Sequence, residues 1–217
     1  MVAPHCDDET LGCGGTLLRH VADGDQVHWL IATSACPESG YSGEQTAAEC
    51  AQVARVAQAF NFKSTRCLNL KPSFLDRVPL SDIIAGLTKV IDEVRPQTIY
   101  LPHCGDVHSD HGIVARAVVS SAKWFRNPSV RRLLAYETLS ETEFGTADAN
   151  GRFAPNVFVD ITPFLDKKIE ILTQYQNEVG AFPFPRSEQA LRALAALRGS
   201  TSGVRAAEAF TLLKEIV

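Results

Sequence analysis

One stretch near the start of the chain sets the expectations for fold and site: Ala3-Pro4-His5-Cys6-Asp7-Asp8-Glu9-Thr10-Leu11-Gly12. It places one imidazole and three carboxylates in five consecutive positions, directly before a glycine-rich segment. A second cluster of the same residue types follows much later, at Asp106-Val107-His108-Ser109-Asp110-His111. Carboxylates and neutral imidazoles are the ligands of hydrolytic Zn²⁺ sites, which usually take three protein ligands and leave one position for water. The two clusters therefore predict a metal-dependent hydrolase.

Short apolar runs alternate with amphipathic segments along the rest of the chain. Residues 27–32, 65–70 and 98–101 read as strands, and residues 46–60, 80–94 and 112–124 read as helices. In segment 80–94 the apolar side chains recur at helical spacing and stop before Arg95-Pro96. A turn at 148–151 predicts a hairpin, with residues 153–161 returning as a strand. Strands that alternate with helices at this rhythm favour βαβ units and a parallel sheet.

Both clusters directly follow an expected strand. His5 comes after Val2-Ala3, and His108 comes after the strand expected at 98–101. Ligands of open α/β sheets bind at the carboxyl ends of strands, where the strand order reverses. We therefore expect the two clusters to meet despite their separation in sequence.

Length and composition limit the class of protein. The 217 residues suit one domain, 1–217, and no linker or repeat divides them. A formal net charge of −4 disfavours nucleic acid as a partner, and no segment has the roughly 20 apolar residues of a membrane span. The first residues lack the pattern of a secretory signal, and the six cysteines lack paired spacing. These features predict a reduced, cytoplasmic protein.

The motifs also carry a family resemblance. The segment from Pro4 to Gly15 resembles the His-Pro-Asp-Asp-Glu signature of the PIG-L/LmbE-like N-acetylglucosamine deacetylases, and His108-Ser109-Asp110-His111 resembles their His-x-Asp-His motif. Weaker matches, from Arg95-Pro96 to Ala207-Glu208-Ala209-Phe210, extend the similarity over nearly the whole chain. The resemblance implies a Rossmann-like, three-layer α/β fold with a mostly parallel central sheet. It also implies Zn²⁺-dependent removal of an N-acetyl group from an N-acetylglucosamine-type amino sugar conjugate, and Fe²⁺ suits the same ligands.

The resemblance also assigns roles, which we state by position in this chain. His5, Asp8 and His111 would bind the metal, and Asp7 would be the general base. His108 would stabilise the oxyanion or protonate the leaving amine, with Asp110 orienting His108 through a hydrogen bond and holding it cationic. Three charged residues in family-like segments are candidate substrate contacts, with surface salt bridges as their alternative role: Arg186, Arg198 and Glu208.

Several readings stay open at this level. Asp7 and Asp8 are also suited to capping the next helix, and Glu9 to a structural role. The glycines that follow are best explained by close helix packing, and Cys6 stands where the family usually has proline. An inactive sugar-binding relative and an amide hydrolase for a non-sugar amine are the alternative functions. The sugar, the group attached to it, the native metal and the formation of a homo-oligomer are not specified by the sequence.

Overall fold

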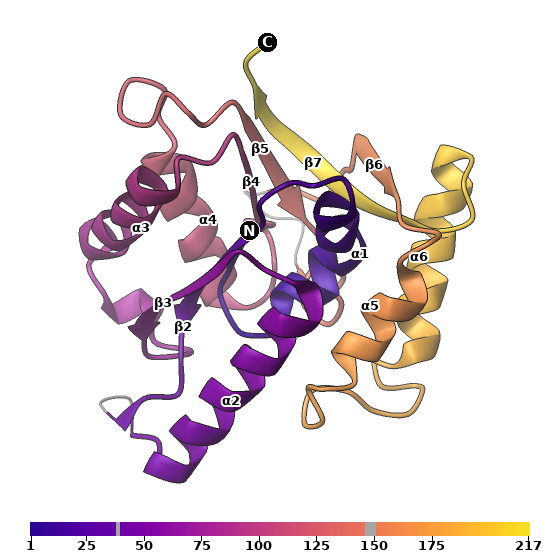
Figure 1. Ribbon diagram of the computed structural model, residues 1–217, viewed down its shortest axis with the longest axis horizontal. Coiled ribbons are helices and arrows are strands. Elements are labelled where there is room, and N and C mark those ends of the chain that lie inside the picture. Colours follow the sequence, from indigo (N-terminus) through magenta and orange to yellow (C-terminus); the bar gives the residue numbers. More distant parts are fainter. Residues whose placement is uncertain (38–39, 146–150) are drawn as a thin grey trace.

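The computed structural model describes residues 1–37, 40–145 and 151–217 (Figure 1). Its elements follow in the order β1 (Val2–Ala3), α1 (Asp8–Ala22), β2 (His28–Thr33), α2 (Gly43–Phe60), β3 (Ser64–Leu70), the 3₁₀ turn η2 (Leu75–Arg77), α3 (Leu80–Val94), β4 (Thr98–Pro102), α4 (Ser109–Ser121), β5 (Arg132–Tyr136), β6 (Val157–Asp160), α5 (Leu165–Leu172), α6 (Glu188–Ser202) and β7 (Ala207–Glu215).

The strands form one mostly parallel layer. Hydrogen bonds join them into two sheets, β1-β2-β3 and β4-β5-β7-β6, and β1 and β4 lie next to each other. The pairs β1–β2, β2–β3 and β4–β5 are parallel, whereas β7 runs antiparallel to both of its neighbours, β5 and β6. The predicted parallel character of the sheet is confirmed.

Helices cover both faces of this layer. Successive side chains of a strand point to opposite faces, and β2 shows this clearly. Leu30 and Ala32 pack in the core with α3 and α4, while Trp29 and Ile31 pack in the second core with α1 and α2. Helices α5 and α6 join α1 and α2 on that second face (Figure 1). The predicted three-layer α/β architecture is confirmed.

Two of the predicted helices shift at their ends for local reasons. Helix α2 begins at Gly43 instead of residue 46, because Ser42 and Gln45 form a reciprocal capping box. Helix α4 spans Ser109–Ser121 instead of 112–124, with His108 as its N-cap residue. The predicted helix at 80–94 has the bounds of α3. The earlier start of α4 places Asp110 and His111 in its first turn.

The expected hairpin is wrong in its pairing. Part of its turn, residues 148–150, lies outside the described residues. Strand β6 covers only Val157–Asp160, and it pairs with β7 instead of β5. The C-terminal strand β7 lies between β5 and β6. A turn signal in the sequence reports only local geometry, so it cannot reveal a strand that arrives from further along the chain.

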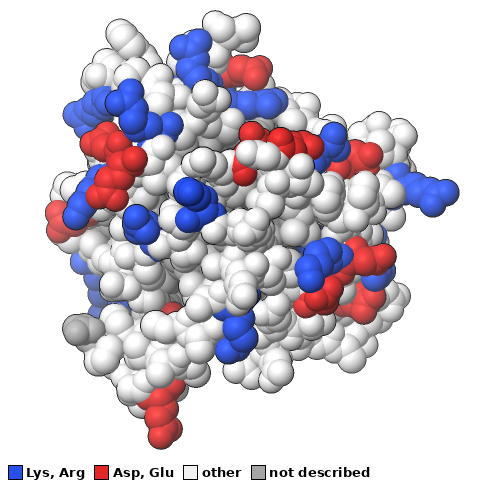
Figure 2. Space-filling view, in the orientation of Figure 1, with Lys and Arg blue, Asp and Glu red and all other residues white. Residues whose placement is uncertain are grey.

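One face of the molecule is mixed in charge. On the face drawn in Figure 2, Lys and Arg are interspersed with Asp and Glu. Among the described helices, none has the length and apolar character needed to cross a lipid bilayer.

Candidate metal centre

The two acidic clusters meet where the strand order reverses. From β1 the chain continues to β2 and β3 on one side, and it then returns to form β4 on the other side of β1. The loop from β1 to α1 carries His5 and Asp7, and the loop from β4 to α4 carries His108. The carboxyl ends of these neighbouring strands form the crevice in which open α/β sheets bind ligands. The prediction that the two clusters lie close together is confirmed.

His5, Asp8 and His111 bring three donor atoms to one point. Oδ2 of Asp8 lies 3.6 Å from Nδ1 of His5 and 3.4 Å from Nε2 of His111. Donors about 2.0–2.1 Å from a tetrahedral Zn²⁺ lie roughly 3.3 Å from each other. The backbone N–H of His5 also donates to Oδ2 of Asp8 over 2.9 Å and fixes that carboxylate. The donor types and their spacing therefore fit a divalent metal.

His111 is held by a residue to which the sequence assigned no role. Its Nδ1–H donates to Asp106 over 2.7 Å, and Asp106 also accepts a hydrogen bond from the Thr142 hydroxyl over 2.6 Å. A carboxylate behind a histidine fixes the tautomer, so that the other ring nitrogen is free to bind a metal. The signal for Asp106 was its place in the second acidic cluster, five residues before His111.

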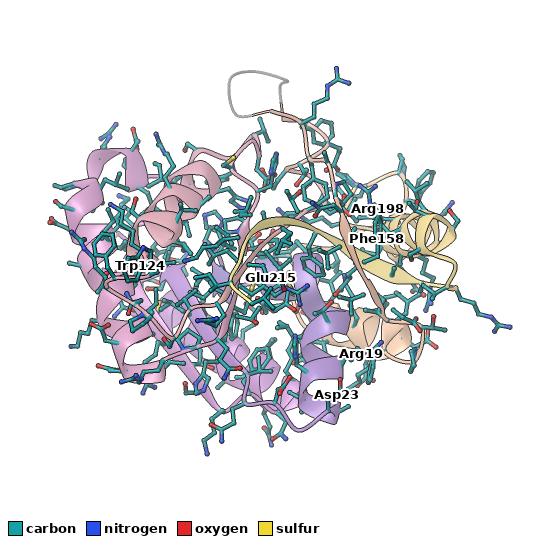
Figure 3. All side chains as sticks on the ribbon, turned by 90° about the horizontal axis from the view of Figure 1, so that it is seen from above. Arg19, Asp23, Trp124, Phe158, Arg198 and Glu215 are labelled. Carbon is teal, nitrogen blue, oxygen red and sulfur yellow. The ribbon has the colours of Figure 1, made fainter. Side chains whose placement is uncertain are left out.

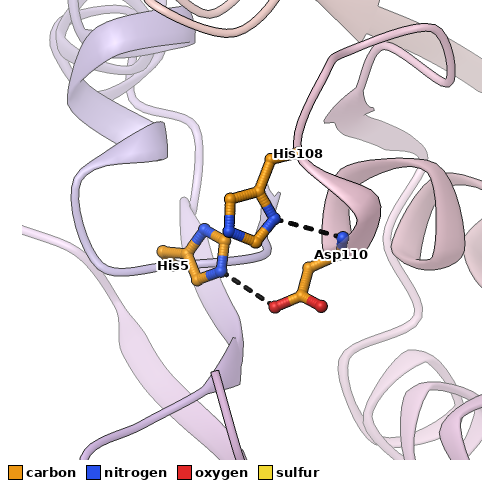
Figure 4. A group of neighbouring side chains, drawn as sticks. All are labelled: His5, His108 and Asp110. Carbon is orange, nitrogen blue, oxygen red and sulfur yellow. Dashed lines mark hydrogen bonds and ion pairs between the residues drawn. The ribbon is translucent and has the colours of Figure 1, made fainter. Parts of the chain in front are cut away.

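The contact between Asp110 and His108 differs from the expected one. The carboxylate of Asp110 faces Nε2 of His5 at 3.1 Å (Figure 4) and accepts the backbone N–H of Ser73 over 2.8 Å. His108 instead accepts the backbone N–H of Asp110 at its own Nδ1, over 3.2 Å. Asp110 therefore orients His108 through its main chain. Burial and the nearby His5 lower the pKa of His108, so His108 is not held cationic.

Asp7 is a buried carboxylate beside the three candidate metal ligands, His5, Asp8 and His111, which we call the donor set. It occupies the N-cap position of α1, but its side chain makes no capping hydrogen bond. Oδ2 of Asp7 instead accepts from the Arg186 guanidinium over 2.6 Å, and the Asp7 side chain is 7% exposed. Burial and the adjacent Asp8 raise the pKa of Asp7 to about 7, although Arg186 opposes this. This is the range in which a carboxylate accepts and returns protons at neutral pH.

The acids and the thiol that flank Asp7 have other environments. Glu9 is fully buried, and its Oε1 accepts hydrogen bonds from Thr10 and from the Tyr175 hydroxyl. These contacts support the structural role for Glu9. Burial raises the pKa of the Cys6 thiol. A thiol that stays protonated is a poor metal ligand, because the thiolate is the binding form.

Glu208 is not a substrate contact in this structure. It is buried in the core, where it accepts from the backbone N–H groups of Gly15 and Thr16 over 2.8 and 2.7 Å. The buried Lys168 donates to Glu208 over 2.7 Å and to the carbonyl of Leu11 over 2.8 Å. Lys168 and Glu208 thus bind the backbone of α1, the helix that follows the loop carrying His5 and Asp7. The buried Glu208 carboxylate accepts three hydrogen bonds from within the protein, which is the reason that the expectation for Glu208 fails.

The glycines of α1 allow this close packing. A Cβ at Gly12 would overlap the ring of Tyr136, and a Cβ at Gly15 would overlap Ile161. The predicted role of these glycines in helix packing is confirmed.

The two candidate arginines lie in different places. Arg186 lines the cavity at the donor set. Arg198 lies on the α6 side of the molecule, across from Trp124 (Figure 3), and makes a bidentate pair with Glu137 at 2.8 and 2.6 Å. It lines a separate cavity of about 470 Å³ together with His103 and Phe153. Only Arg186 therefore borders the candidate metal centre.

Comparison with known proteins places the chain in a family. A family model described as PIG-L, GlcNAc-PI de-N-acetylase, matches residues 1–122, which is more than half of the chain. The chain belongs to the PIG-L family. As a PIG-L member it is 27% identical, over 176 residues, to the 1D-myo-inositol 2-acetamido-2-deoxy-alpha-D-glucopyranoside deacetylase of Saccharomonospora viridis. That match covers 67% of this chain and 63% of the relative.

Two further relatives match nearly the whole chain. The diacetylchitobiose deacetylase of Thermococcus kodakarensis is 23% identical over 216 residues, covering 95% of this chain and 79% of the relative. The N,N'-diacetylchitobiose deacetylase of Pyrococcus horikoshii, solved with an inhibitor, has a TM-score of 0.77 at 20% identity. The structural match covers 98% of this chain and 82% of the Pyrococcus horikoshii chain. This second likeness is one of fold.

We expect metal affinity to rise steeply with pH. Burial disfavours the charged imidazoles, but Asp110 and Asp8 raise the pKa of His5 to about 9, and Asp8 and Asp106 raise that of His111 to about 10. Metal binding must displace these protons. Below pH 9 the affinity should therefore rise by up to about tenfold per pH unit for each displaced proton.

Calorimetric titration of the metal-free protein with Zn²⁺ at pH 6, 7 and 8, in buffers of different ionisation enthalpy, measures both the affinity and the protons released. Affinity that does not change with pH would contradict the assignment of His5 and His111 as ligands.

The same protonated imidazoles stabilise the metal-free fold below their ordinary pKa of 6.5. This stabilisation is lost as the pH rises through about 9 to 10.

Proposed function

We propose that this PIG-L family member is a metal-dependent hydrolase that removes the N-acetyl group from an acetamido sugar conjugate. Zn²⁺ is the proposed metal, and Fe²⁺ suits the same two imidazoles and one carboxylate. One observation carries the proposal. Beside the three donors His5, Asp8 and His111 there is a separate buried carboxylate, Asp7, whose pKa is about 7. A site that only bound a metal would not need this second acid. The named activities of the relatives support the choice of an acetamido sugar.

The residues around the donor set have complementary tasks in amide hydrolysis. A divalent metal held by His5, Asp8 and His111 would supply a Lewis acid, which polarises an amide carbonyl and acidifies water. Asp7 accepts the proton of the attacking water. An amine leaves poorly unless it is protonated, so the proton on Asp7 is then returned to the nitrogen as the C–N bond breaks.

His108 acts as a hydrogen-bond donor in this scheme. Because its Nδ1 accepts the N–H of Asp110, the neutral ring carries its hydrogen on Nε2. That N–H can donate to the carbonyl oxygen as negative charge develops there. The lowered pKa of His108 suits this neutral form.

The proposal is tested by acetate release. Metal-stripped protein and protein reloaded with Zn²⁺ or Fe²⁺ are incubated with glycosides of N-acetylglucosamine and with N-acetylated amines that lack a sugar. We expect acetate and free amine in equal amounts, only from the sugars and only after reloading. Binding of the sugar without acetate release would instead indicate an inactive sugar-binding relative. Release only from the non-sugar amides would indicate the other amide hydrolase.

Arg186 should set the pH at which Asp7 works. Its positive charge opposes the rise in the pKa of Asp7. In Arg186→Gln we therefore expect the pKa of Asp7 to exceed 7, so that the acidic limb of the kcat/KM profile moves to higher pH. Arg192→Gln is the matched control, because Arg192 pairs with Glu188 and Asp166 on the surface. An acidic limb at the same pH in both variants would show that Asp7 does not govern it.

A further inference from the structure

A large cavity opens at the donor set. Its volume is about 730 Å³, and its walls include His5, Asp7 and His108. Helix α2 and residues 174–178, which follow α5, form a large part of the remaining wall. The cavity has room for more than one acetamido group, so its side chains decide what else the substrate carries.

Carboxylates outnumber cationic side chains in these walls. Four carboxylates and two guanidinium groups line the cavity, and they belong to Asp7, Glu49, Glu141, Glu178, Arg55 and Arg186. A divalent metal would add positive charge at the donor set, where the carboxylates of Asp7 and Asp8 offset it. Away from the donor set the balance is therefore set by the glutamates and the arginines.

The guanidinium of Arg186 is already hydrogen-bonded to other side chains of the protein. Arg186 donates from Nη1 to Asp7 over 2.6 Å and to Glu178 over 2.9 Å, and from Nη2 to Glu141 over 3.3 Å. Its Nε–H donates to the Ser140 hydroxyl over 2.7 Å. Four hydrogen bonds use nearly all of the five N–H donors of an arginine. Even with the charge of Asp7 assigned to the metal, the carboxylates of Glu141 and Glu178 around one guanidinium leave its surroundings negative.

The guanidinium of Arg55 cannot take the place of Arg186 as a partner for an anionic group. Arg55 is exposed on α2, where solvent ions screen its charge. On the same helix Glu49 is half-buried and accepts the backbone N–H of Ala35 over 2.7 Å. Away from the metal, an anionic group inside the cavity would lose water without gaining an unengaged, buried cationic partner, and burial of an unpaired charge is costly.

Neutral polar groups make up much of the remaining wall. Hydroxyl and amide side chains that line the cavity include Ser34, Gln45, Gln52, Gln174, Gln176 and Asn177. Such groups both donate and accept, which suits the hydroxyls of a sugar.

We infer that the cavity takes an acetamido sugar whose attached group is uncharged or cationic, and that it discriminates against an anionic group. The inference rests on the proposed function for the acetamido end. The discrimination itself comes from Glu141, Glu178 and Glu49, together with an Arg186 that is engaged by its own protein partners.

Binding and turnover are measured side by side on the metal-loaded protein of residues 1–217. The probes are the methyl glycoside of N-acetylglucosamine, its 6-sulfate and its 2-aminoethyl analogue. Sulfate is chosen because it is a weaker metal ligand than phosphate. Since like charges repel, we expect the 6-sulfate to bind about tenfold or more weakly than the neutral glycoside. The cationic analogue should bind as tightly as the neutral glycoside or more tightly.

Variants separate the charge of the cavity from the chemistry. In Glu141→Gln/Glu178→Gln, removal of two carboxylates releases Arg186, so the ratio of neutral to sulfated affinity should fall toward one. A ratio within one variant cancels any general effect on the site. Glu93→Gln, exposed on α3 on the other face of the sheet, should keep the parent ratio.

The outcomes are distinguishable. Equal or tighter binding of the 6-sulfate by the parent protein would overturn the inference, as would an unchanged ratio in the double variant or the absence of binding by any of the glycosides. A preserved binding preference without acetate release would overturn the proposed reaction and support the charge preference of the cavity.

Discussion

Replacing Asp7 with asparagine should lower kcat for acetate release by about 10²–10⁴-fold, the usual contribution of a general base. The asparagine keeps the shape of the side chain and an oxygen for Arg186, but it cannot accept a proton. Because Asp8 is the proposed metal ligand of the pair, bound metal should be retained. The expected result is therefore a protein with strongly reduced activity and its metal in place.

The pH profile gives this substitution a second readout. Since the pKa of Asp7 is about 7, activity of the parent protein should fall as the pH drops below neutrality. The residual activity of Asp7→Asn should lack this limb. Asp92→Asn, on the exposed side of α3, is the matched control and should behave as the parent. Full activity of Asp7→Asn at neutral pH would remove Asp7 from the mechanism.

Replacing Lys168 with methionine should lower the free energy of unfolding by about 3–5 kcal/mol, the usual effect of removing one partner of a buried ion pair. The side chains of Lys168 and Glu208 are only 7% and 5% exposed. Without the ammonium group, Glu208 keeps a buried charge, and the Leu11 carbonyl of α1 loses a donor. Urea unfolding of the metal-free protein measures the loss.

The neighbouring lysine provides the control. Lys167 is 44% exposed and pairs with Glu170 at 2.7 Å. Exposed pairs contribute about 0–1 kcal/mol, so Lys167→Met should change stability by no more than that. Equal losses in the two variants would show that the Lys168–Glu208 pair does not hold α1.

The fold could be predicted because its signals are local. Apolar residues at helical spacing and the following Arg95-Pro96 specify α3. The strand residues around Trp29 and Leu30 are apolar on both faces, as expected of a strand covered by helices. Pairings across long sequence distances could not be predicted in this way, and the insertion of β7 between β5 and β6 is the example.

The candidate site, too, could be predicted where its signals are local but not where they depend on tertiary contacts. The residue types of the two motifs, and their positions after β1 and β4, were enough to anticipate that the two clusters would meet. The family resemblance singled out His5, Asp8 and His111 within them. The direction in which each side chain points depends on tertiary contacts. Asp110 turns its carboxylate to His5, and Glu208 turns to α1, through hydrogen bonds that span 105 and 193 positions of the chain.

We propose above all that His5, Asp8 and His111 together hold the metal. Elemental analysis of the parent protein and of His111→Ala, purified anaerobically in parallel, tests this role most directly. Near-neutral urea unfolding of both proteins verifies that the variant is folded. We predict one equivalent of a divalent metal in the parent and essentially none in folded His111→Ala. One equivalent of metal in folded His111→Ala would contradict the claim.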